Sequence, residues 1–289
     1  MSKIKGRRDA RLIKNISPMH KIMVRIKPER CDSDVYINEK VDVTNLIEYM
    51  DNLKKENPSD HPTLFHAFCY AIARTIFLRP KLNRYIIGGK TYERYDVSLG
   101  FVCKTKFEDH AEELMTLIKM DPNFKLNDLK DEIKKHVKQI RGTNDKKSTD
   151  KTVALVASMP DFVQNIVVSV FKFLDRHDLL PQKMCDTLLY YSSVIVSDIG
   201  SFDCDGIYHN ITNFGTNSIL VTIGAVRKKY VLNDKGEAEE RYVTTLGVTL
   251  DERIADGYYF IKSIKLLEKI LENPELLEEK ISDELDGEW

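Results

Sequence analysis

The sequence predicts a mixed α/β protein that folds as one compact domain. Hydrophobic residues make up 42% of the 289 residues, which is enough for a substantial core. Segments in which apolar and polar residues alternate, as in strands, are interspersed with segments in which apolar residues recur at helical spacing. The two kinds do not follow one another as regular strand–helix units, and the sequence has no internal repeat, so a mixed α/β fold is expected.

The elements of the first half follow from periodicity and from the residues that begin or end each segment. Strands are expected at residues 20–28, 34–43 and 96–105. Helices are expected at residues 44–56, 62–78 and 126–142. Thr44 is a candidate N-cap of the first helix, Pro58 lies beyond its end, and the second helix is apolar around most of its circumference, which indicates burial. A hairpin is expected at residues 84–95, where Gly88 and Gly89 supply a tight turn.

The second half begins with TNDKKSTDK, residues 143–151, which is the most linker-like stretch of the chain. Three further strands are expected at residues 190–201, 217–231 and 241–250. The last two of these strands form a long hairpin. The chain then closes with helices that are broken at Asn273 and Pro274.

An amphipathic helix is expected from Pro160, a residue type that can open a helix as its first residue. Seven apolar residues recur there at helical spacing: Phe162, Val163, Ile166, Val167, Val170, Phe171 and Leu174. Polar residues interrupt the stripe, so it is not a membrane span. We expect it to be buried on the same chain, where a charge at Val167 would destabilise the fold. The alternative is contact with a protein partner or a membrane surface.

The net charge of −1 favours neither nucleic acid nor a membrane surface as a partner. The charge is unevenly distributed, because residues 1–30 carry ten basic and two acidic residues, whereas residues 268–289 carry nine acidic and two basic residues. We expect residues 1–17 to form a basic N-terminal arm that is solvated or pairs with an acidic surface. A nucleic-acid-binding arm is the less favoured interpretation.

Cysteine usage and hydropathy indicate a cytoplasmic protein. The five cysteines include no CxxC pair, no apolar segment of a signal peptide follows the basic N-terminus, and no apolar run reaches the roughly 18 residues of a membrane span. The seven histidines do not fall at a strong metal-ligand spacing, so no metal site is expected. The sequence also lacks GxxxxGK[ST], and it has no GxGxxG between a strand and a helix.

Two polar segments late in the chain carry the candidate chemistry. SSVIVSDIGSF ends a strand at Ser197, whose hydroxyl can donate a hydrogen bond to a developing oxyanion, although an ordinary turn has the same composition. Residues 249–257, TLDERIADG, place four charged residues between a strand and a helix: Asp251, Glu252, Arg253 and Asp256. This segment is either a catalytic turn or a salt-bridged turn in which Arg253 neutralises Asp251 or Asp256, and spacing alone leaves both open.

Five segments, taken in order, carry a resemblance to a known family. They are EKVDVTNLIEYMDNLKK, RPKLNRYIIGGKTYERYDVSLGFV, SSVIVSDIGSF, TLDERIADG and LLEKILENPELL, and together they span roughly residues 18–280. The set resembles the chloramphenicol acetyltransferase-like superfamily, most nearly the catalytic domain of the dihydrolipoyl acyltransferases of 2-oxo acid dehydrogenase complexes. In that family the third segment reads Ser-Asn-(Leu/Ile)-Gly and the fourth reads Asp-His-Arg-x-x-Asp-Gly.

The resemblance implies a chloramphenicol acetyltransferase-like two-layer α/β sandwich with a mixed sheet. The acyltransferase-like domain would cover residues 18–289, with a helical insertion near residues 143–189. The family also implies a homotrimer with active sites between subunits, coenzyme A or acyl-CoA as a small-molecule thioester substrate, and no metal. No segment resembles a lipoyl domain or a subunit-binding domain.

Residue roles carried over from the family fall on four positions besides Glu252. Ser197 matches the hydroxyl that stabilises the oxyanion, and Asp256 matches the carboxylate that holds the loop in shape. Gly257 matches the glycine of the motif, and Arg253 supports the same loop. Asp256 is expected to receive hydrogen bonds or to pair with a basic residue of the first strand, such as Lys21 or Arg25.

Glu252 stands where the family carries the catalytic histidine that takes a proton from a thiol. Unperturbed pKa values of about 8.5 for a thiol, 6.5 for His and 4.3 for Glu make this transfer uphill by about 2.7 kcal/mol to His and about 5.7 kcal/mol to Glu. The difference of about 3 kcal/mol corresponds to roughly a hundredfold in rate. Burial of a carboxyl can raise its pKa by several units and close that gap.

Two hypotheses follow for the function of the chain, and a scaffold subunit is a third, less favoured interpretation. The first is a CoA-dependent acyltransferase with an unknown acceptor, in which Glu252 acts as a modified base. The second is a non-catalytic protein of the same fold, a pseudoenzyme, which binds an acyl-CoA-like ligand or, through the inserted helix, a protein partner. An apolar cavity around Glu252 would favour the first hypothesis, whereas a solvent-exposed or ion-paired Glu252 would favour the second.

Overall fold

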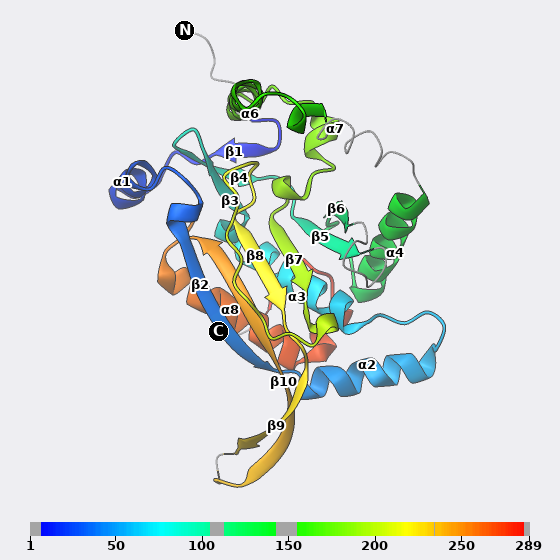
Figure 1. The fold of residues 1–289 in the computed structure, drawn as a ribbon. Helices are drawn as coiled ribbons and strands as arrows, with labels where there is room; N and C mark the ends of the chain where they lie inside the picture. Colours follow the sequence, from blue (N-terminus) through cyan, green and yellow to red (C-terminus); the bar gives the residue numbers. More distant parts are fainter. Residues whose placement is uncertain (1–6, 105–112, 143–154, 234, 286–289) are drawn as a thin grey trace.

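The structure, a computed structural model, describes residues 7–104, 113–142, 155–233 and 235–285 (Figure 1). The expected linker at 143–151 lies outside these residues. The strands are β1 Ala10–Leu12, β2 Asp34–Asp42, β3 Arg84–Ile87, β4 Lys90–Arg94, β5 Ser98–Lys104, β6 Glu113–Lys119, β7 Val194–Asp198, β8 Ile219–Ile223, β9 Arg227–Leu232 and β10 Ala238–Asp251. The helices are α1 Pro18–Ile26, α2 Thr44–Glu56, α3 Leu64–Leu78, α4 Leu126–Gly142, α6 Asp161–Arg176, α7 Gln182–Cys185 and α8 Gly257–Glu272, followed by a 3₁₀ helix at Pro274–Glu278.

The central sheet is mixed, in agreement with the expected fold class. Its strands run in the order β2-β10-β8-β7-β5-β6, and β9 pairs with the first half of β10. β7 is parallel to β5 and β8, and the other pairs are antiparallel. The 14-residue β10 pairs with β2 and β8 at its C-terminal half and extends with β9 into an arm beyond the sheet (Figure 1).

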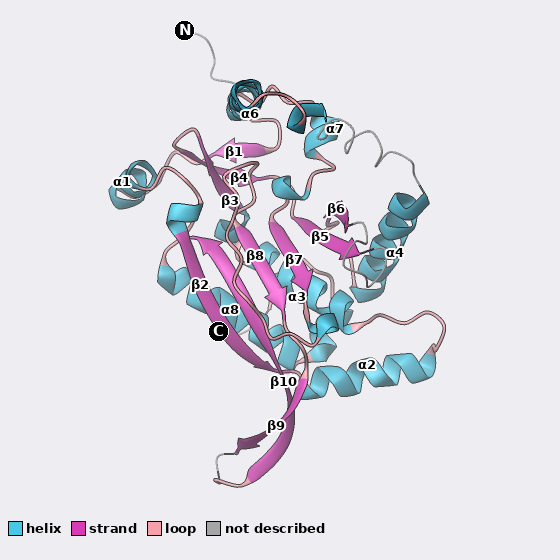
Figure 2. Ribbon diagram, in the orientation of Figure 1, coloured by secondary structure: helices cyan, strands magenta, loops and turns pink. Residues whose placement is uncertain are grey.

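Helices α2, α3, α4 and α8 form a layer against one face of this sheet (Figure 2). α3 is buried over most of its length, as its apolar circumference predicts. Arg74, at the centre of α3, is fully buried, donates hydrogen bonds to the carbonyl oxygens of Leu276 and Asp283, and pairs with Glu279. The segment after α8 is therefore anchored to the helical layer.

The opposite face of the sheet is covered by the chain between β7 and β8 (Figure 1). The Thr222 hydroxyl on β8 donates a hydrogen bond to the carbonyl oxygen of Ile207. Gly247 on β10 is required at this contact, because a Cβ there would collide with the same carbonyl oxygen. Close backbone packing explains why β8 and the end of β10 are buried on both faces.

The N-terminal residues pack against β4 and against the end of α6. β1 joins β4 and β3 in a small sheet of order β1-β4-β3. Arg7 is buried and donates a hydrogen bond of 2.6 Å to the carbonyl oxygen of Asp175, and Arg8 pairs with Asp178 at 3.1 Å. The basic residues thus meet acidic residues at the end of α6.

The strand expected at residues 20–28 is wrong, because residues 20–26 belong to helix α1. The Ser17 hydroxyl accepts a hydrogen bond from the backbone N–H of His20, and Pro18 occupies the first turn, so the local chemistry starts a helix. Two other expectations were imperfect. Thr44 is the first residue of α2 rather than its cap, and residues 217–231 divide into β8 and β9.

Helix α6 forms as expected, but its apolar stripe is not buried on the chain. Phe162, Ile166 and Val170 are exposed, with 66%, 58% and 49% of their surface accessible. The helix packs instead through Phe171 and Leu174, which contact a small apolar cluster beneath it. Sequence periodicity identifies an amphipathic helix, but it does not show which surface covers the apolar side.

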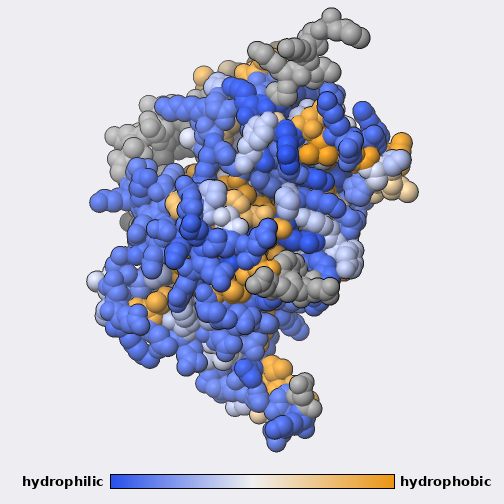
Figure 3. All heavy atoms as spheres, turned by 180° about the vertical axis from the view of Figure 1, so that it is seen from behind, coloured by the Kyte–Doolittle hydropathy of each residue, from blue (hydrophilic) through white to orange (hydrophobic). Residues whose placement is uncertain are grey.

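Exposed apolar side chains also occur on α1 and on the β9–β10 arm. Met19 and Ile26 of α1 are 69% and 67% exposed, and Leu232 of β9 is 70% exposed. In Figure 3 apolar groups gather at the edge where α1 lies and at the arm, whereas most of that face is hydrophilic. Side chains of this size and exposure are typical of contacts with another protein surface.

We predict that Ile166→Asp leaves the free energy of unfolding within about 0.5 kcal/mol of the wild type, because the side chain is exposed. Leu174→Ala on the same helix should cost about 2 kcal/mol, because it removes packing against the cluster. Chemical denaturation at one protein concentration measures both values. An Ile166→Asp variant as unstable as Leu174→Ala would contradict the described packing of α6.

Candidate functional site

The turn at residues 251–257 lies where three segments of the chain meet. β10 ends at Asp251, whose partner in the sheet is Asp34 at the start of β2. α8 begins at Gly257. The segment between α1 and β2, which includes Lys27, lies against the same turn. The turn is therefore part of the packed end of the sheet.

Asp251 and Arg253 form a buried ion pair inside the turn. Their carboxylate and guanidinium groups make two hydrogen bonds, of 2.8 and 2.7 Å, and the side chains are 0% and 1% exposed. Arg253 also donates 2.9 Å hydrogen bonds to the carbonyl oxygens of Lys27 and Pro28. Arg253 thus neutralises Asp251, which is one of the two arrangements that the sequence left open, and it ties β10 to the end of α1.

Glu252 projects from this turn into an ion pair. Its backbone N–H donates a 2.9 Å hydrogen bond to the carbonyl oxygen of Ser33, and its carboxylate accepts a hydrogen bond from the Lys27 ammonium. The Glu252 side chain is 26% exposed and the Lys27 side chain is 35% exposed. Within one chain, Glu252 is therefore half-buried and ion-paired, and it does not lie in an apolar cavity.

Asp256 caps the N-terminus of α8, and Gly257 is the first helical residue. The Asp256 carboxylate accepts a 2.9 Å hydrogen bond from the backbone N–H of Tyr259, and this bond lowers the pKa of the carboxyl. Its basic neighbour is Lys81, at 3.9 Å. The expected partners Lys21 and Arg25 were wrong, because the segment that carries them is a helix rather than a strand.

Ser197 lies at the other end of the sheet from Glu252. It is half-buried near the end of β7 and pairs with Thr222 of β8, which in turn pairs with Gly247 of β10. Glu252 follows Gly247 by five residues, and a rise of about 3.4 Å per residue separates the two positions by roughly 17 Å along the strands. One chain therefore brings Glu252, Arg253 and Asp256 together but leaves Ser197 apart.

Three residues near the turn were not identified from the sequence: Lys27, Arg30 and Asp34. Burial and the nearby Asp251 raise the pKa of the Asp34 carboxyl, and its Oδ1 is buried without a hydrogen-bond partner among the described residues. Oδ2 accepts hydrogen bonds of 3.2 Å from Asn210 and from the backbone of Ile211. The only sequence feature that pointed to Lys27 and Arg30 was the basic composition of residues 1–30. No sequence pattern around Asp34 distinguished it from other acidic residues.

Metal and membrane features were searched over the described residues only. No group of three or more His, Cys, Asp or Glu side chains there could hold a metal ion. No helix of the described part of the chain is both long and apolar enough to cross a membrane.

One protein-family model matches part of the chain. The model of the 2-oxoacid dehydrogenases acyltransferase (catalytic domain) family matches residues 188–278, a range that contains Ser197 and the whole turn at 251–257. A search of curated protein sequences finds no significant match. The resemblance inferred from the ordered segments is confirmed.

Solved structures show the same fold at low sequence identity. A probable dihydrolipoamide acetyltransferase from Listeria monocytogenes is 18% identical, with a TM-score of 0.57 over 96% of this chain and 98% of that chain. The dihydrolipoamide acetyltransferase of Azotobacter vinelandii, solved to study a serine, a histidine and an asparagine in its catalytic mechanism, is 15% identical, with a TM-score of 0.54 over 92% and 93%. A chloramphenicol acetyltransferase is 12% identical, with a TM-score of 0.52 over 91% and 99%. The fold is chloramphenicol acetyltransferase-like.

We predict that breaking the buried pair destabilises the whole domain. Arg253→Met leaves the Asp251 carboxylate buried without its partner and should lower the free energy of unfolding by about 3–5 kcal/mol. The matched control is Glu240→Gln, which breaks the exposed pair with Lys228 and should change stability by less than about 1 kcal/mol. Equal effects in urea denaturation would show that the Asp251–Arg253 pair does not hold the turn.

Proposed function

We propose that this chain is a CoA-dependent acyltransferase-like protein whose thioester site forms between copies of the chain. We further propose that it binds the thioester but transfers the acyl group to a thiol slowly or not at all. The observation that carries this second part is the ion pair between Lys27 and Glu252 at the position of the family's base.

The chemistry of the proton transfer explains why the ion pair matters. A carboxylate becomes a stronger base in an apolar surrounding, because the charged form is then disfavoured. At Glu252 the carboxylate already accepts a hydrogen bond from the Lys27 ammonium, so it must leave this partner before it can take a proton from a thiol. The acyltransferase fold and the shape of the turn support thioester binding, whereas the ion pair argues against rapid deprotonation of a thiol.

The second candidate function is acyl transfer that uses a carboxyl group as base. Asp34 favours it, because burial raises the pKa of this carboxyl and so brings it closer to that of a thiol. Asp34 lies opposite Asp251, at the same end of the sheet as Glu252. In this candidate Asp34 accepts the proton and Glu252 remains paired with Lys27.

A thiol-release assay with a panel of acyl-CoAs, combined with calorimetric binding of CoA, separates these functions. We expect wild type to bind CoA and to show thiol release near the background rate. Glu252→His should raise the rate by roughly a hundredfold, because the histidine has the better matched pKa. Lys21→Met, a change of an exposed lysine on α1, is the control that should leave the rate unchanged.

Each alternative has its own outcome in the same assay. If wild type releases thiol well above background and Asp34→Asn lowers this rate, the second candidate is supported. If Glu252→Gln lowers the rate instead, Glu252 is supported as the base. Absence of CoA binding in wild type would contradict both candidate functions, although the fold would stand.

We predict that the chain forms a trimer in solution, as the family that it resembles implies. A site that uses both Ser197 and Glu252 would then lie between two neighbouring copies, because the two residues are too far apart in one chain to act on one thioester. Sedimentation at micromolar concentration should give about three chains per particle. A monomer at that concentration would leave Ser197 and Glu252 separate and would contradict the proposed site.

A further inference from the structure

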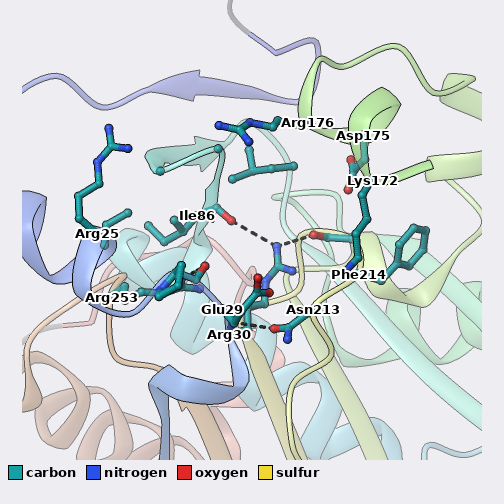
Figure 4. A pocket seen from close by; sticks show the side chains of 16 residues that line it. Arg25, Glu29, Arg30, Ile86, Lys172, Asp175, Arg176, Asn213, Phe214 and Arg253 are labelled. Atoms are coloured by element: carbon teal, nitrogen blue, oxygen red, sulfur yellow. Dashed lines mark hydrogen bonds between the residues drawn. The ribbon is translucent and has the colours of Figure 1, made fainter. Parts of the chain in front are cut away.

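A cavity of about 380 Å³ lies beside the turn at 251–257, between α1, the β3–β4 turn, α6 and residues 213–215. Figure 4 shows its lining side chains arranged around a common space, with Arg25 and Arg176 on different elements and Arg30 near the centre. The volume falls within the range of small-molecule pockets in proteins. The wall formed by α6 belongs to the region that we expect to be an insertion, and it lies outside residues 188–278, which the family model matches.

Positive charge predominates in this cavity. Five basic and two acidic side chains line it: Arg25, Arg30, Lys172, Arg176 and Arg253, with Glu29 and Asp175. The two carboxylates do not cancel this positive charge. Asp175 already pairs with Arg7, and Glu29 supplies only one negative charge, at an exposed position. Arg25, Lys172 and Arg176 are exposed and form no ion pair with another described residue.

Arg30 provides an independent indication of an anionic ligand. It is only 6% exposed, and its terminal nitrogens donate hydrogen bonds to the carbonyl oxygens of Ile86, Thr212 and Gly215. Its Nε is buried without a hydrogen-bond partner, and no carboxylate pairs with its guanidinium among the described residues. Burial lowers the pKa of Arg30, and the nearby Asp251 carboxylate, which is itself paired with Arg253, acts in the opposite direction.

The turn between β3 and β4 lets two of the guanidinium groups approach the cavity closely. Gly88 and Gly89 adopt φ values of +59° and +71°, which favour glycine. A Cβ on Gly88 would lie 3.1 Å from Nε of Arg176, and a Cβ on Gly89 would lie 2.9 Å from Nη1 of Arg25. Any side chain at the turn would push these two groups away, so the glycines help to keep them at the cavity.

We propose that this cavity binds a small molecule that carries two adjacent phosphate groups. Guanidinium groups match phosphate oxygens through paired hydrogen bonds, and Arg25 and Arg176 approach the cavity from two different helices. Two phosphate groups carry roughly three to four negative charges. The cavity offers a similar net positive charge, because the single negative charge of Glu29 is set against four basic side chains: Arg25, Arg30, Lys172 and Arg176. The proposal does not depend on catalysis at Glu252.

Inorganic pyrophosphate is the probe for this site, titrated by calorimetry into the full chain. We expect binding to wild type that weakens at least tenfold in the double variant Lys172→Gln/Arg176→Gln, both on the exposed rim. The control is Lys54→Gln/Lys229→Gln, which removes the same charge from exposed positions that do not line the cavity. It should change the affinity by less than twofold, and melting temperatures confirm that all three proteins are folded.

Two results would overturn the proposal: no pyrophosphate binding to the folded wild type at millimolar concentration, or equal weakening in the control variant. A competition with saturating CoA then identifies the source of the phosphate groups. Displacement of bound pyrophosphate assigns the cavity to the diphosphate of CoA, and undisturbed binding assigns it to a separate phosphorylated compound. If CoA binds nowhere while pyrophosphate binds, the proposed function fails and the cavity assignment stands.

Discussion

The ion pair between Asp251 and Arg253 is the contact on which the geometry of the candidate site depends. Both side chains are buried, and the hydrogen bonds from Arg253 to the carbonyl oxygens of Lys27 and Pro28 join the end of β10 to the segment after α1. A buried pair of this kind contributes little net stability relative to well-packed apolar side chains. Here the pair fixes the position of the turn that carries Glu252. Glu252 lies between two anchored residues, and Arg253 also forms part of the wall of the basic cavity.

The register of the sheet imposes the second constraint. β10 runs antiparallel to β8, and β7 runs parallel to β8, so the C-terminal ends of β7 and β10 point in opposite directions. Ser197 lies near the C-terminal end of β7, and Glu252 follows the C-terminal end of β10. The two residues are therefore separated within one chain. A site that uses both residues needs two copies of the chain. The exposed apolar groups on α1 and the β9–β10 arm offer surfaces for such contacts.

Local patterns predicted most of the fold, because periodicity, capping residues and glycine turns act over a few residues. The hairpin at Gly88 and Gly89 and the largely apolar α3 are examples. Residues 20–28 were misassigned because a short apolar run fits both periods, and Ser17 decides the outcome through its cap. The partner of Glu252 was not predictable, because Lys27 lies 225 residues away in the sequence. The same holds for the buried Asp34 and for the cavity that α6 completes, since both arise from tertiary packing.

Chemical cross-linking between subunits tests the central claim most directly. In a background without the exposed Cys31 and Cys204, a variant with Ser197→Cys and Glu252→Cys would be treated with a short bis-maleimide. The account predicts covalent dimers and trimers on a denaturing gel, because the two cysteines meet between subunits, and neither single variant should form them. A double variant that stays monomeric while both cysteines react would contradict a site shared between copies.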